Sequence, residues 1–369
     1  MHLCKIKAPK SCVNRWEVVI PMIRKKHIKK QIIMLMAAVA LLTLPGCGSG
    51  AVPEKPDNEI KIGITVYDRY DTFIAEILKD LNEDVLSARA EAGQEITLEI
   101  YNSSQSQSTQ DDQVEEMIKH GCDVICVNLV DRTAPSNIID AARNADIPIV
   151  FFNRELVDED MLRWNKLYYV GADAFESGIM QGELAVDIIK NENADRNNDG
   201  EIQYVILEGE AGHQDAIVRS ENCVNRIREL GVKLDKLGYA IANWNRAQAS
   251  NQMEKLIKNH GDKIEFVFAN NDDMALGVID AYNVSDIPEY KRPYVIGIDG
   301  TEPGRAAVKE GSMAATVYND ARGQADAIFN LSKRLASGDS LEGLGLQGDK
   351  YIRLPYRKIT KQNVDSFND

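Results

Sequence analysis

Residues 124–152, VICVNLVDRTAPSNIIDAARNADIPIVFF, predict two strands with a helix between them. The runs Val124–Asn128 and Ile147–Phe152 are short and apolar, which is typical of parallel strands that are covered on both faces. Between them, Pro135–Asn144 repeats its apolar residues at the helical period. The stretch therefore predicts a βαβ unit, which is the building block of a doubly wound sheet.

The same alternation of strands and helices extends in both directions from about residue 60. Upstream we expect helices at Phe73–Ala90 and Asp111–His120 and strands at Lys61–Val66 and Thr97–Asn102. A second series of strands is expected at Leu167–Val170, Tyr204–Leu207, Phe266–Ala269 and Tyr294–Ile298. Two such series predict an α/β protein with two doubly wound parallel-sheet domains, which several strand crossovers join as a hinge. We expect the N-terminal domain at residues 60–147 plus 320–352, and the C-terminal domain at residues 148–319 plus 353–369.

The first 46 residues have the parts of an export signal. A basic cluster, Arg24–Lys30, precedes the apolar run Ile32–Leu44, which is shorter than the ~20 residues of a membrane span. Leu44-Pro45-Gly46-Cys47 then resembles the bacterial lipobox, whose cysteine is acylated and becomes the mature N-terminus. We therefore expect a signal peptide over residues 1–46, a lipid on Cys47 and a flexible linker over 47–59. Ordinary secretory cleavage, and a start at Met22 in place of Met1, remain open.

Charge and cysteine content exclude some classes of function. Removing residues 1–46 takes nine basic residues and one glutamate from totals of 43 and 57, so the mature chain has a net charge of −22. This acidity argues against nucleic-acid binding, which requires a basic face. Cys122, Cys126 and Cys223 remain as an odd number without a paired framework, and we expect them to be buried hydrophobic residues.

The loop Asp195–Gln203, DRNNDGEIQ, has the ligand order of a calcium loop. Oxygen side chains stand at positions 1, 3, 5 and 9, glycine stands at 6, and position 7 offers its backbone carbonyl. Position 12 holds Ile206, so a carboxylate from elsewhere must complete the ~six to eight oxygens that calcium requires. A surface turn without metal is the alternative. The expected ligands in the loop are Asp195, Asn197, Asp199, Glu201 through its carbonyl, and Gln203.

Polar and aromatic side chains follow most of the predicted strands. Ligands of doubly wound sheets bind beyond the carboxyl ends of the strands, so these side chains are candidate ligand contacts. Carboxylates, amides, one arginine and one histidine suit a neutral polyhydroxylated ligand, because each hydroxyl both donates and accepts a hydrogen bond. Aromatic rings can cover the apolar faces of a pyranose. The candidates are Tyr67, Asp71, Phe73, Asn128, His213, Asp215, Arg219, Trp244, Asn271, Asp299 and Asn319.

These residues also have structural explanations. An Asp or Asn at the end of a strand can be the N-cap of the next helix. Arg219 can pair with Asp215, which lies one helical turn before it. His213 can be an ordinary loop histidine, Trp244 a core residue, and Tyr67 a residue that mainly shapes the cleft.

Short motifs give the chain a specific resemblance to one family. From Lys61 to the C-terminus it resembles the galactose/glucose-binding family of bacterial periplasmic binding proteins, which serves methyl-galactoside ABC transport. All eleven candidates above carry the residue type that holds the sugar in that family. Two departures are the polar stretch Asp68–Tyr70 and Gly300, where a larger residue is usual. The resemblance rests on IGITVY, NLVD, IVFFNRE, YYVGAD, ESGIMQG, DRNNDGEIQ, GEAGHQDA, ANNDDMALG, VIGIDG, TVYNDA and LPY.

The resemblance implies a type I binding protein and not an enzyme. Its two domains would close around D-galactose or D-glucose and deliver the sugar to an ABC permease. The lipobox at Cys47 favours attachment to the outer face of the cytoplasmic membrane. The family also implies a structural calcium ion whose remaining ligand is Glu265, and a monomer. A chemoreceptor is a further partner that the family implies.

Three rival functions follow from the same residues. A glycosidase would need paired catalytic carboxylates, and no such pattern accompanies Asp71, Asp215 and Asp299. A sugar-responsive repressor would need a DNA-binding headpiece before Lys61, where the chain has an export signal instead. A sensor that presents a related monosaccharide to a chemoreceptor or a sensor kinase remains open.

Overall fold

The eight predicted strands and four further strands form two separate sheets of six strands each. The protein is described by a computed structural model over residues 59–92 and 95–367; the expected signal peptide, Cys47 and the linker up to residue 58 lie outside them. The first sheet has the order β11-β5-β4-β3-β1-β2. Its strands are β1 (Glu59–Val66), β2 (Glu95–Asn102), β3 (Val124–Val127), β4 (Ile149–Phe152), β5 (Leu167–Gly171) and β11 (Tyr351–Arg353).

The second sheet repeats this arrangement with the order β12-β10-β9-β8-β6-β7. All its pairs are parallel except β10 with β12, which is antiparallel. Its strands are β6 (Ile202–Glu208), β7 (Leu234–Ile241), β8 (Phe266–Ala269), β9 (Tyr294–Ile296), β10 (Ala315–Tyr318) and β12 (Arg357–Thr360). We call the first sheet with its helices the first lobe, and the second sheet with its helices the second lobe.

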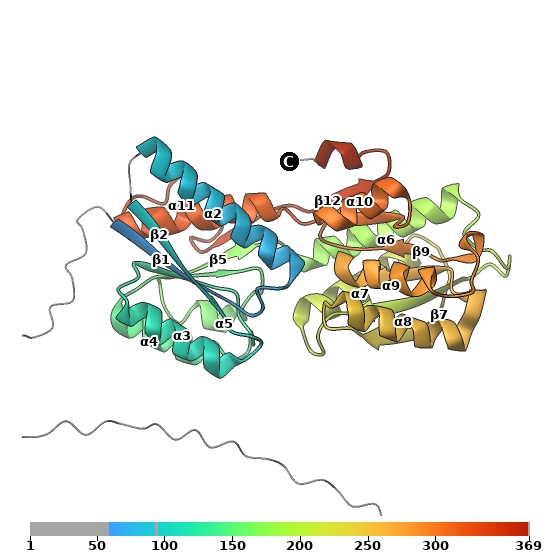
Figure 1. The fold of residues 1–369 in the computed structure, drawn as a ribbon, viewed down its shortest axis with the longest axis horizontal. Helices are drawn as coiled ribbons and strands as arrows, with labels where there is room; N and C mark the ends of the chain where they lie inside the picture. The colour runs from blue at the N-terminus through green and yellow to red at the C-terminus, as the bar shows by residue number, and fades with distance from the viewer. Residues whose placement is uncertain (1–58, 93–94, 368–369) are drawn as a thin grey trace, which may run out of the picture. The chain divides into compact units, whose positions relative to one another are not determined.

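Helices cover both faces of each sheet (Figure 1). In the first lobe α2 packs with α11, and α3 packs with α4; in the second lobe α6 packs with α7, and α8 packs with α9. The helices are α2 (Thr72–Ala92), α3 (Gln107–Lys119), α4 (Ser136–Ala145), α5 (Asp158–Met161), α6 (Ala174–Asn191), α7 (Gln214–Glu229), α8 (Arg246–His260), α9 (Asp272–Asn283), α10 (Glu302–Glu310) and α11 (Ala321–Ser337). Short 3₁₀ turns occur at Gly261–Lys263, Glu289–Lys291 and Val364–Phe367.

Each sheet separates two apolar cores, because the side chains of a strand alternate between its faces. In β4, Val150 and Phe152 enter the core beneath α2 and α11. Ile149 and Phe151 enter the core beneath α3 and α4. The strands β3, β4 and β8 are buried at every position, which explains why they are continuously apolar.

In the part of the chain that the structure describes, the backbone passes between the lobes three times. It crosses after β5, again between β10 and α11, and a third time between β11 and β12. Three adjacent crossovers allow the lobes to rotate about a hinge, as in other domain closures. This arrangement agrees with the predicted fold class of two doubly wound domains.

The domain boundary that we expect at residue 148 is wrong. β4 pairs with β3, and β5 pairs with β4, so both strands belong to the first sheet. The first crossover therefore follows Gly171. Apolar runs identify strands, but they do not say which sheet a strand joins, because strands of both sheets have the same character.

Candidate functional site: a pocket between the two lobes

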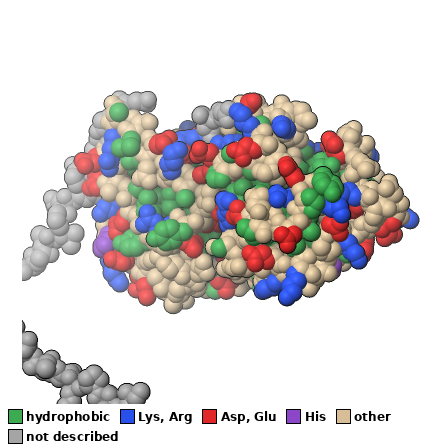
Figure 2. All heavy atoms as spheres, turned by 45° about the vertical axis from the view of Figure 1, so that its right-hand side comes forward, with side chains coloured by type: hydrophobic (Ala, Val, Ile, Leu, Met, Phe, Trp, Pro, Cys, Tyr) green, Lys and Arg blue, Asp and Glu red, His purple; other side chains and the backbone are tan. Residues whose placement is uncertain are grey.

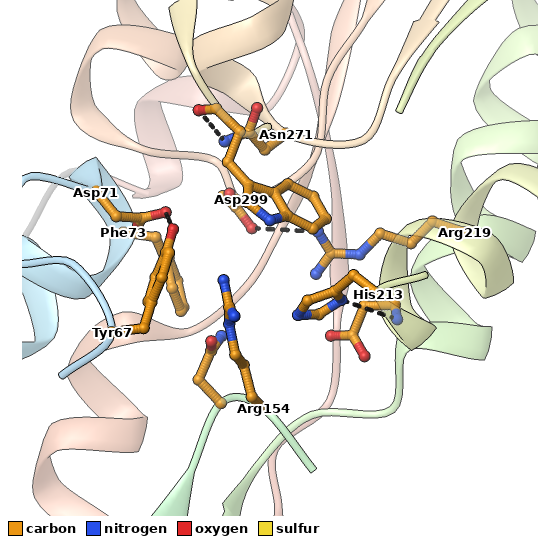
Figure 3. A pocket seen from close by; sticks show the side chains of 11 residues that line it. Tyr67, Asp71, Phe73, Arg154, His213, Arg219, Asn271 and Asp299 are labelled. Atoms are coloured by element: carbon orange, nitrogen blue, oxygen red, sulfur yellow. Dashed lines mark hydrogen bonds and ion pairs between the residues drawn. The ribbon is translucent and has the colours of Figure 1, made fainter. Parts of the chain in front are cut away.

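One pocket brings together nine of the eleven predicted ligand contacts (Figure 3). It has about 360 Å³ of empty space, part of which is open to solvent. Three of the nine belong to the first lobe and six to the second. The nine are Tyr67, Asp71, Phe73, His213, Asp215, Arg219, Trp244, Asn271 and Asp299.

The first lobe contributes side chains from the turn between β1 and α2. The Tyr67 hydroxyl donates a hydrogen bond to Asp71 Oδ2 at 2.6 Å. Asp71 Oδ1 accepts the backbone N–H of Ile74 at 3.0 Å, so this carboxylate also caps α2. The ring of Phe73 stands in the first turn of α2 and is buried. Helix capping and pocket lining are thus compatible at Asp71.

The second lobe places His213 at the N-cap of α7. Its Nδ1 accepts the backbone N–H of Asp215 at 3.2 Å, which leaves Nε2–H as a donor. Burial, with help from the nearby Arg154 and Arg219 guanidinium groups, lowers the pKa of His213 well below its ordinary value. The imidazole is therefore neutral and packs edge-on against the Trp244 ring, with 5.1 Å between ring centroids.

Arg219 is a buried cation that organises the polar end of the pocket. Its Nη1 donates to the Asn270 carbonyl at 2.8 Å, and its Nη2 donates to the Tyr356 hydroxyl at 3.2 Å. Among the described residues its ion-pair partner is Asp299, at 3.9 Å, and not Asp215. Burial raises the pKa of both aspartates, and the Arg219 charge opposes that shift. Arg219 is therefore a fixed hydrogen-bond donor, and Asp215 and Asp299 are acceptors whose ionisation is costly unless a positive charge lies nearby.

Asp299 adopts a strained backbone conformation, with φ at 115°. Such conformations persist where neighbouring contacts hold them, and they gather at functional sites. Here the Asp299 N–H donates to Val317 O at 2.8 Å, and its carbonyl accepts from Asn319 N at 2.9 Å. Gly300 follows with φ at 65°, and a Cβ there would lie 2.9 Å from the Tyr318 ring. This close approach explains why the position departs from the larger residue that the family pattern predicts.

Two predicted contacts lie behind the pocket and do not line it. Asn128 is fully buried, and its amide accepts from Tyr67 N at 3.3 Å and donates to the Phe152 carbonyl at 3.2 Å. The amide oxygen of Asn319, also buried, accepts from Gln324 at 2.7 Å. In this structure both amides position neighbouring segments of the site.

Two residues that line the pocket are absent from the predicted set. Asn153 and Arg154 directly follow β4, and the rule that selected other strand ends applies to them as well. The Arg154 guanidinium lies 3.6 Å over the centroid of the Tyr67 ring. The signal was present in the run IVFFNRE, which predicts a strand followed by a polar pair.

The predicted calcium loop folds back on itself at the start of β6. Its side chains point inward: Asp195 Oδ2 accepts from Gly200 N at 2.9 Å, and Asn197 Oδ1 accepts from Asp199 N at 2.8 Å. The Asn197 amide also donates to the Gln203 amide oxygen at 2.9 Å. Gly200 has φ at 83°, which is the conformation that the turn requires of glycine.

Glu265 reaches this loop from the segment before β8. Its Oε1 accepts from Arg196 N at 2.6 Å, and its Oε2 accepts from Gln203 N at 3.0 Å. Within the described residues, no three His, Cys, Asp or Glu side chains are gathered closely enough to hold a metal by themselves. A calcium ion would therefore depend on amide and carbonyl oxygens as well, and the loop supplies them. The residues fit this ion by donor type.

Comparisons with known proteins agree on the fold and the family. The periplasmic binding protein domain family matches residues 62–340. The D-galactose/methyl-galactoside binding periplasmic protein MglB of Haemophilus influenzae is 33% identical over 344 residues, which cover 92% of this chain and 99% of that protein. The ribose import binding protein RbsB of Bacillus subtilis is 27% identical over 339 residues, which cover 90% and 100%.

A solved structure supports the same assignment. An ABC transporter solute binding protein from Bacillus halodurans, with bound myo-inositol, matches with a TM-score of 0.71 and 26% identity. The match covers 85% of this chain and 99% of that one. In residues 59–92 and 95–367, none of the helices has the length and apolar character needed to cross a membrane. The proteins of this family are exported, and they bind solutes without transforming them. The chain therefore belongs to the periplasmic binding protein family, as a type I member.

Proposed function

We propose that this chain is a lipid-anchored extracytoplasmic receptor that captures D-galactose or D-glucose and delivers it to an ABC permease. The observation that carries this proposal is the convergence of nine predicted contacts, from two lobes and five chain segments, on one pocket. Acidic and basic side chains are interspersed on the face drawn in Figure 2, which does not favour a nucleic-acid partner there.

The chemistry of the pocket supports a neutral sugar. Asp71, Asp215 and Asp299 can accept hydrogen bonds from sugar hydroxyls, while Arg219 and the Nε2–H of His213 can donate them. Hydrogen bonds to charged partners contribute about 1.5–3 kcal/mol each. The buried Arg219 guanidinium pairs with Asp299, and its charge also acts on Asp215, so the ligand itself need not carry charge.

The choice among sugars rests on the relatives. The galactose-binding relative supports a hexose. Other relatives are named for ribose and xylitol, and one solved relative holds myo-inositol. All of these ligands are neutral polyols. We propose galactose or glucose because all eleven family positions keep their residue type.

Capture would proceed by closure of the lobes. Tyr67, Asp71 and Phe73 belong to one lobe, and His213 and Trp244 to the other. Only a closed protein lets both sets contact one sugar, so the sugar favours the closed state by its additional contacts there. The permease would recognise that state, and a chemoreceptor or sensor kinase is the alternative recipient.

We further propose that a calcium ion stabilises the second lobe. Asp195, Asn197, Asp199 and Gln203 would bind it with the carbonyl of Glu201, and Glu265 would complete the set. An ion that binds only the folded state adds to stability by mass action. The lipid on Cys47 would hold the monomer at the outer face of the cytoplasmic membrane.

Tryptophan fluorescence tests the proposed ligand. The chain from Gly48 onward contains the compact unit Pro56–Asp369 and two tryptophans, Trp164 and Trp244. We expect D-galactose or D-glucose to change the emission saturably, and D-ribose, L-arabinose and myo-inositol to have weaker effects. Trp164→Phe should keep the response, whereas Trp244→Phe should lose it. A folded protein that responds only to a pentose or to myo-inositol would contradict the proposal.

A further inference from the structure

One ion pair crosses directly from one lobe to the other at the pocket. Arg154 follows β4 in the first lobe, and Glu210 follows β6 in the second. Arg154 Nη2 lies 3.0 Å from Glu210 Oε1. The arginine side chain is 4% exposed and the glutamate 28% exposed, so water screens this pair only in part.

Arg154 is held in place by its own lobe. Its Nη1 donates to the Val130 carbonyl at 2.9 Å, and its guanidinium stacks 3.6 Å over the Tyr67 ring. Both partners lie in the first lobe, so the guanidinium does not need Glu210 to keep its position. Glu210 is the partner that departs when the lobes separate.

Two further hydrogen bonds join the lobes at the α2 side. The Thr72 hydroxyl donates to Asp273 Oδ2 at 2.6 Å. The Glu302 N–H donates to Glu76 Oε1 at 3.1 Å. These bonds connect α2 with the starts of α9 and α10. The Arg154–Glu210 pair differs from them because it lies at the pocket itself, with Arg154 among the lining residues.

We propose that Arg154 and Glu210 form an interlobe latch, made only in the closed protein, that sets sugar affinity and the rate of sugar release. This inference rests on the proposed capture by closure. A contact made only in the closed state raises the closed fraction before any sugar binds, and apparent affinity scales with that fraction. Sugar enters the open protein, in which the latch is not made, so loss of the latch should accelerate dissociation more than it slows association.

Interlobe distances in the sugar-free protein test the latch directly. Spin labels on Leu86→Cys in α2 and Val284→Cys after α9 would report the separation of the lobes, because both sites are exposed. The native cysteines Cys122, Cys126 and Cys223 are buried. We expect Glu210→Gln to shift the distance distribution toward longer separations, and a double electron–electron resonance measurement would show it.

The binding measurement has a matched control. The Glu155 carboxylate forms a bidentate ion pair with Arg353: Nη2 donates to Oε1 at 2.5 Å and Nη1 donates to Oε2 at 2.9 Å. Both residues lie in the first lobe. Glu155→Gln therefore removes the same charge without touching an interlobe contact. We expect Glu210→Gln to weaken hexose binding about tenfold, mainly through the dissociation rate, and Glu155→Gln to change it less than about threefold.

A double-mutant cycle decides between a latch and two independent effects. If Arg154 and Glu210 act as a pair, Arg154→Gln combined with Glu210→Gln should weaken binding less than the product of the single losses. Independent losses, or unchanged distances in sugar-free Glu210→Gln, would overturn the latch. A wild-type protein that binds no hexose would instead overturn the proposed function. The interlobe distances measured without sugar would still test the latch in that case.

Discussion

Two buried carboxyl groups and one imidazole determine how the pocket responds to pH. Burial raises the pKa of Asp215 and of Asp299 above the ordinary aspartate value, although Arg219 opposes both shifts. Burial also lowers the pKa of His213. Each carboxyl therefore takes up a proton at a higher pH than an exposed aspartate would, whereas the imidazole stays neutral to a lower pH than an exposed histidine would.

We expect hexose affinity to fall as pH is lowered through the range of the raised pKa values of Asp215 and Asp299. Ionised Asp215 and Asp299 accept sugar hydroxyls, so affinity is complete above their raised pKa values and is lost as pH falls through them. His213 remains neutral in this range and does not offset the loss. Calorimetric titrations across the range, with melting temperatures at each pH, would separate weaker binding from unfolding.

Asp272 provides a control for this pH effect. It is buried, its pKa is raised to about 7 by burial, and it does not line the pocket. Its carboxylate accepts from Thr301 N at 2.8 Å and from the Thr316 hydroxyl at 2.5 Å. In Asp272→Asn the fall in affinity should persist; if it vanishes, Asp272 and not the pocket carboxyls causes it.

The sequence predicts a pocket residue mainly where that residue follows a recognisable strand. The strand-end rule found Asp71, His213 and Asp299, and it should also have selected Arg154. It could not tell that Asn128 lies behind the pocket, because chain position does not determine which way a side chain points. The interlobe partner of Arg154, Glu210, depends on tertiary placement and has no local signal.

At the scale of elements, the turn after β7 holds Trp244 in the left-handed region, with φ at 59°. The Asn271 amide donates to the Trp244 carbonyl at 3.3 Å. The ring lies against the backbone of Gly209, at the end of β6, where a methyl group would overlap it. The glycine thus allows the indole to reach the pocket.

We expect Gly209→Ala to weaken sugar binding by displacing the Trp244 ring. Overpacking of this kind costs about 1–3 kcal/mol, and part of that cost should fall on the orientation of the ring. Gly238→Ala is a comparison, because it also overpacks the second lobe but meets Leu256 and lies away from the pocket. Equal affinity loss in the two variants, measured by calorimetry, would show a general loss of stability and no specific effect on Trp244.

The loop Asp195–Gln203 gives a prediction about calcium. We expect a chelator to lower the melting temperature by several degrees, because an ion at ~100 times its dissociation constant adds about 2.7 kcal/mol. Glu265→Gln should remove most of this response. Glu201→Gln should keep it, because Glu201 would bind through its backbone carbonyl. A wild-type melting temperature that ignores chelator would contradict the site.

The sequence predicts where most strands lie along the chain, but it does not predict which strands pair with one another. The runs at β3, β4 and β8 are apolar on both faces, which the sequence makes visible. The edge strand β7, LDKLGYAI, is only partly buried and carries charges, so no strand was predicted there. The placement of β4 and β5 in the first sheet depends on pairing between distant segments.

At the scale of the whole molecule, two α/β lobes share one binding site. The site is assembled from strand ends of both sheets, and three crossovers join the lobes beside it. Neither lobe alone presents both Phe73 and Trp244 to one ligand. The central claim is therefore capture of a hexose by two lobes together.

A calorimetric titration of D-galactose and D-glucose into wild-type protein and two variants tests that claim most directly. The variants are Asp71→Asn in the first lobe and Asp215→Asn in the second, and Asp68→Asn is the control because it lies outside the pocket. Loss of one charged acceptor is worth about 1.5–3 kcal/mol, so each pocket variant should bind about 10 to 100 times more weakly, while Asp68→Asn should bind like wild type. If wild-type protein binds neither hexose, or if the variant of only one lobe weakens binding, two-lobed capture of a hexose is wrong.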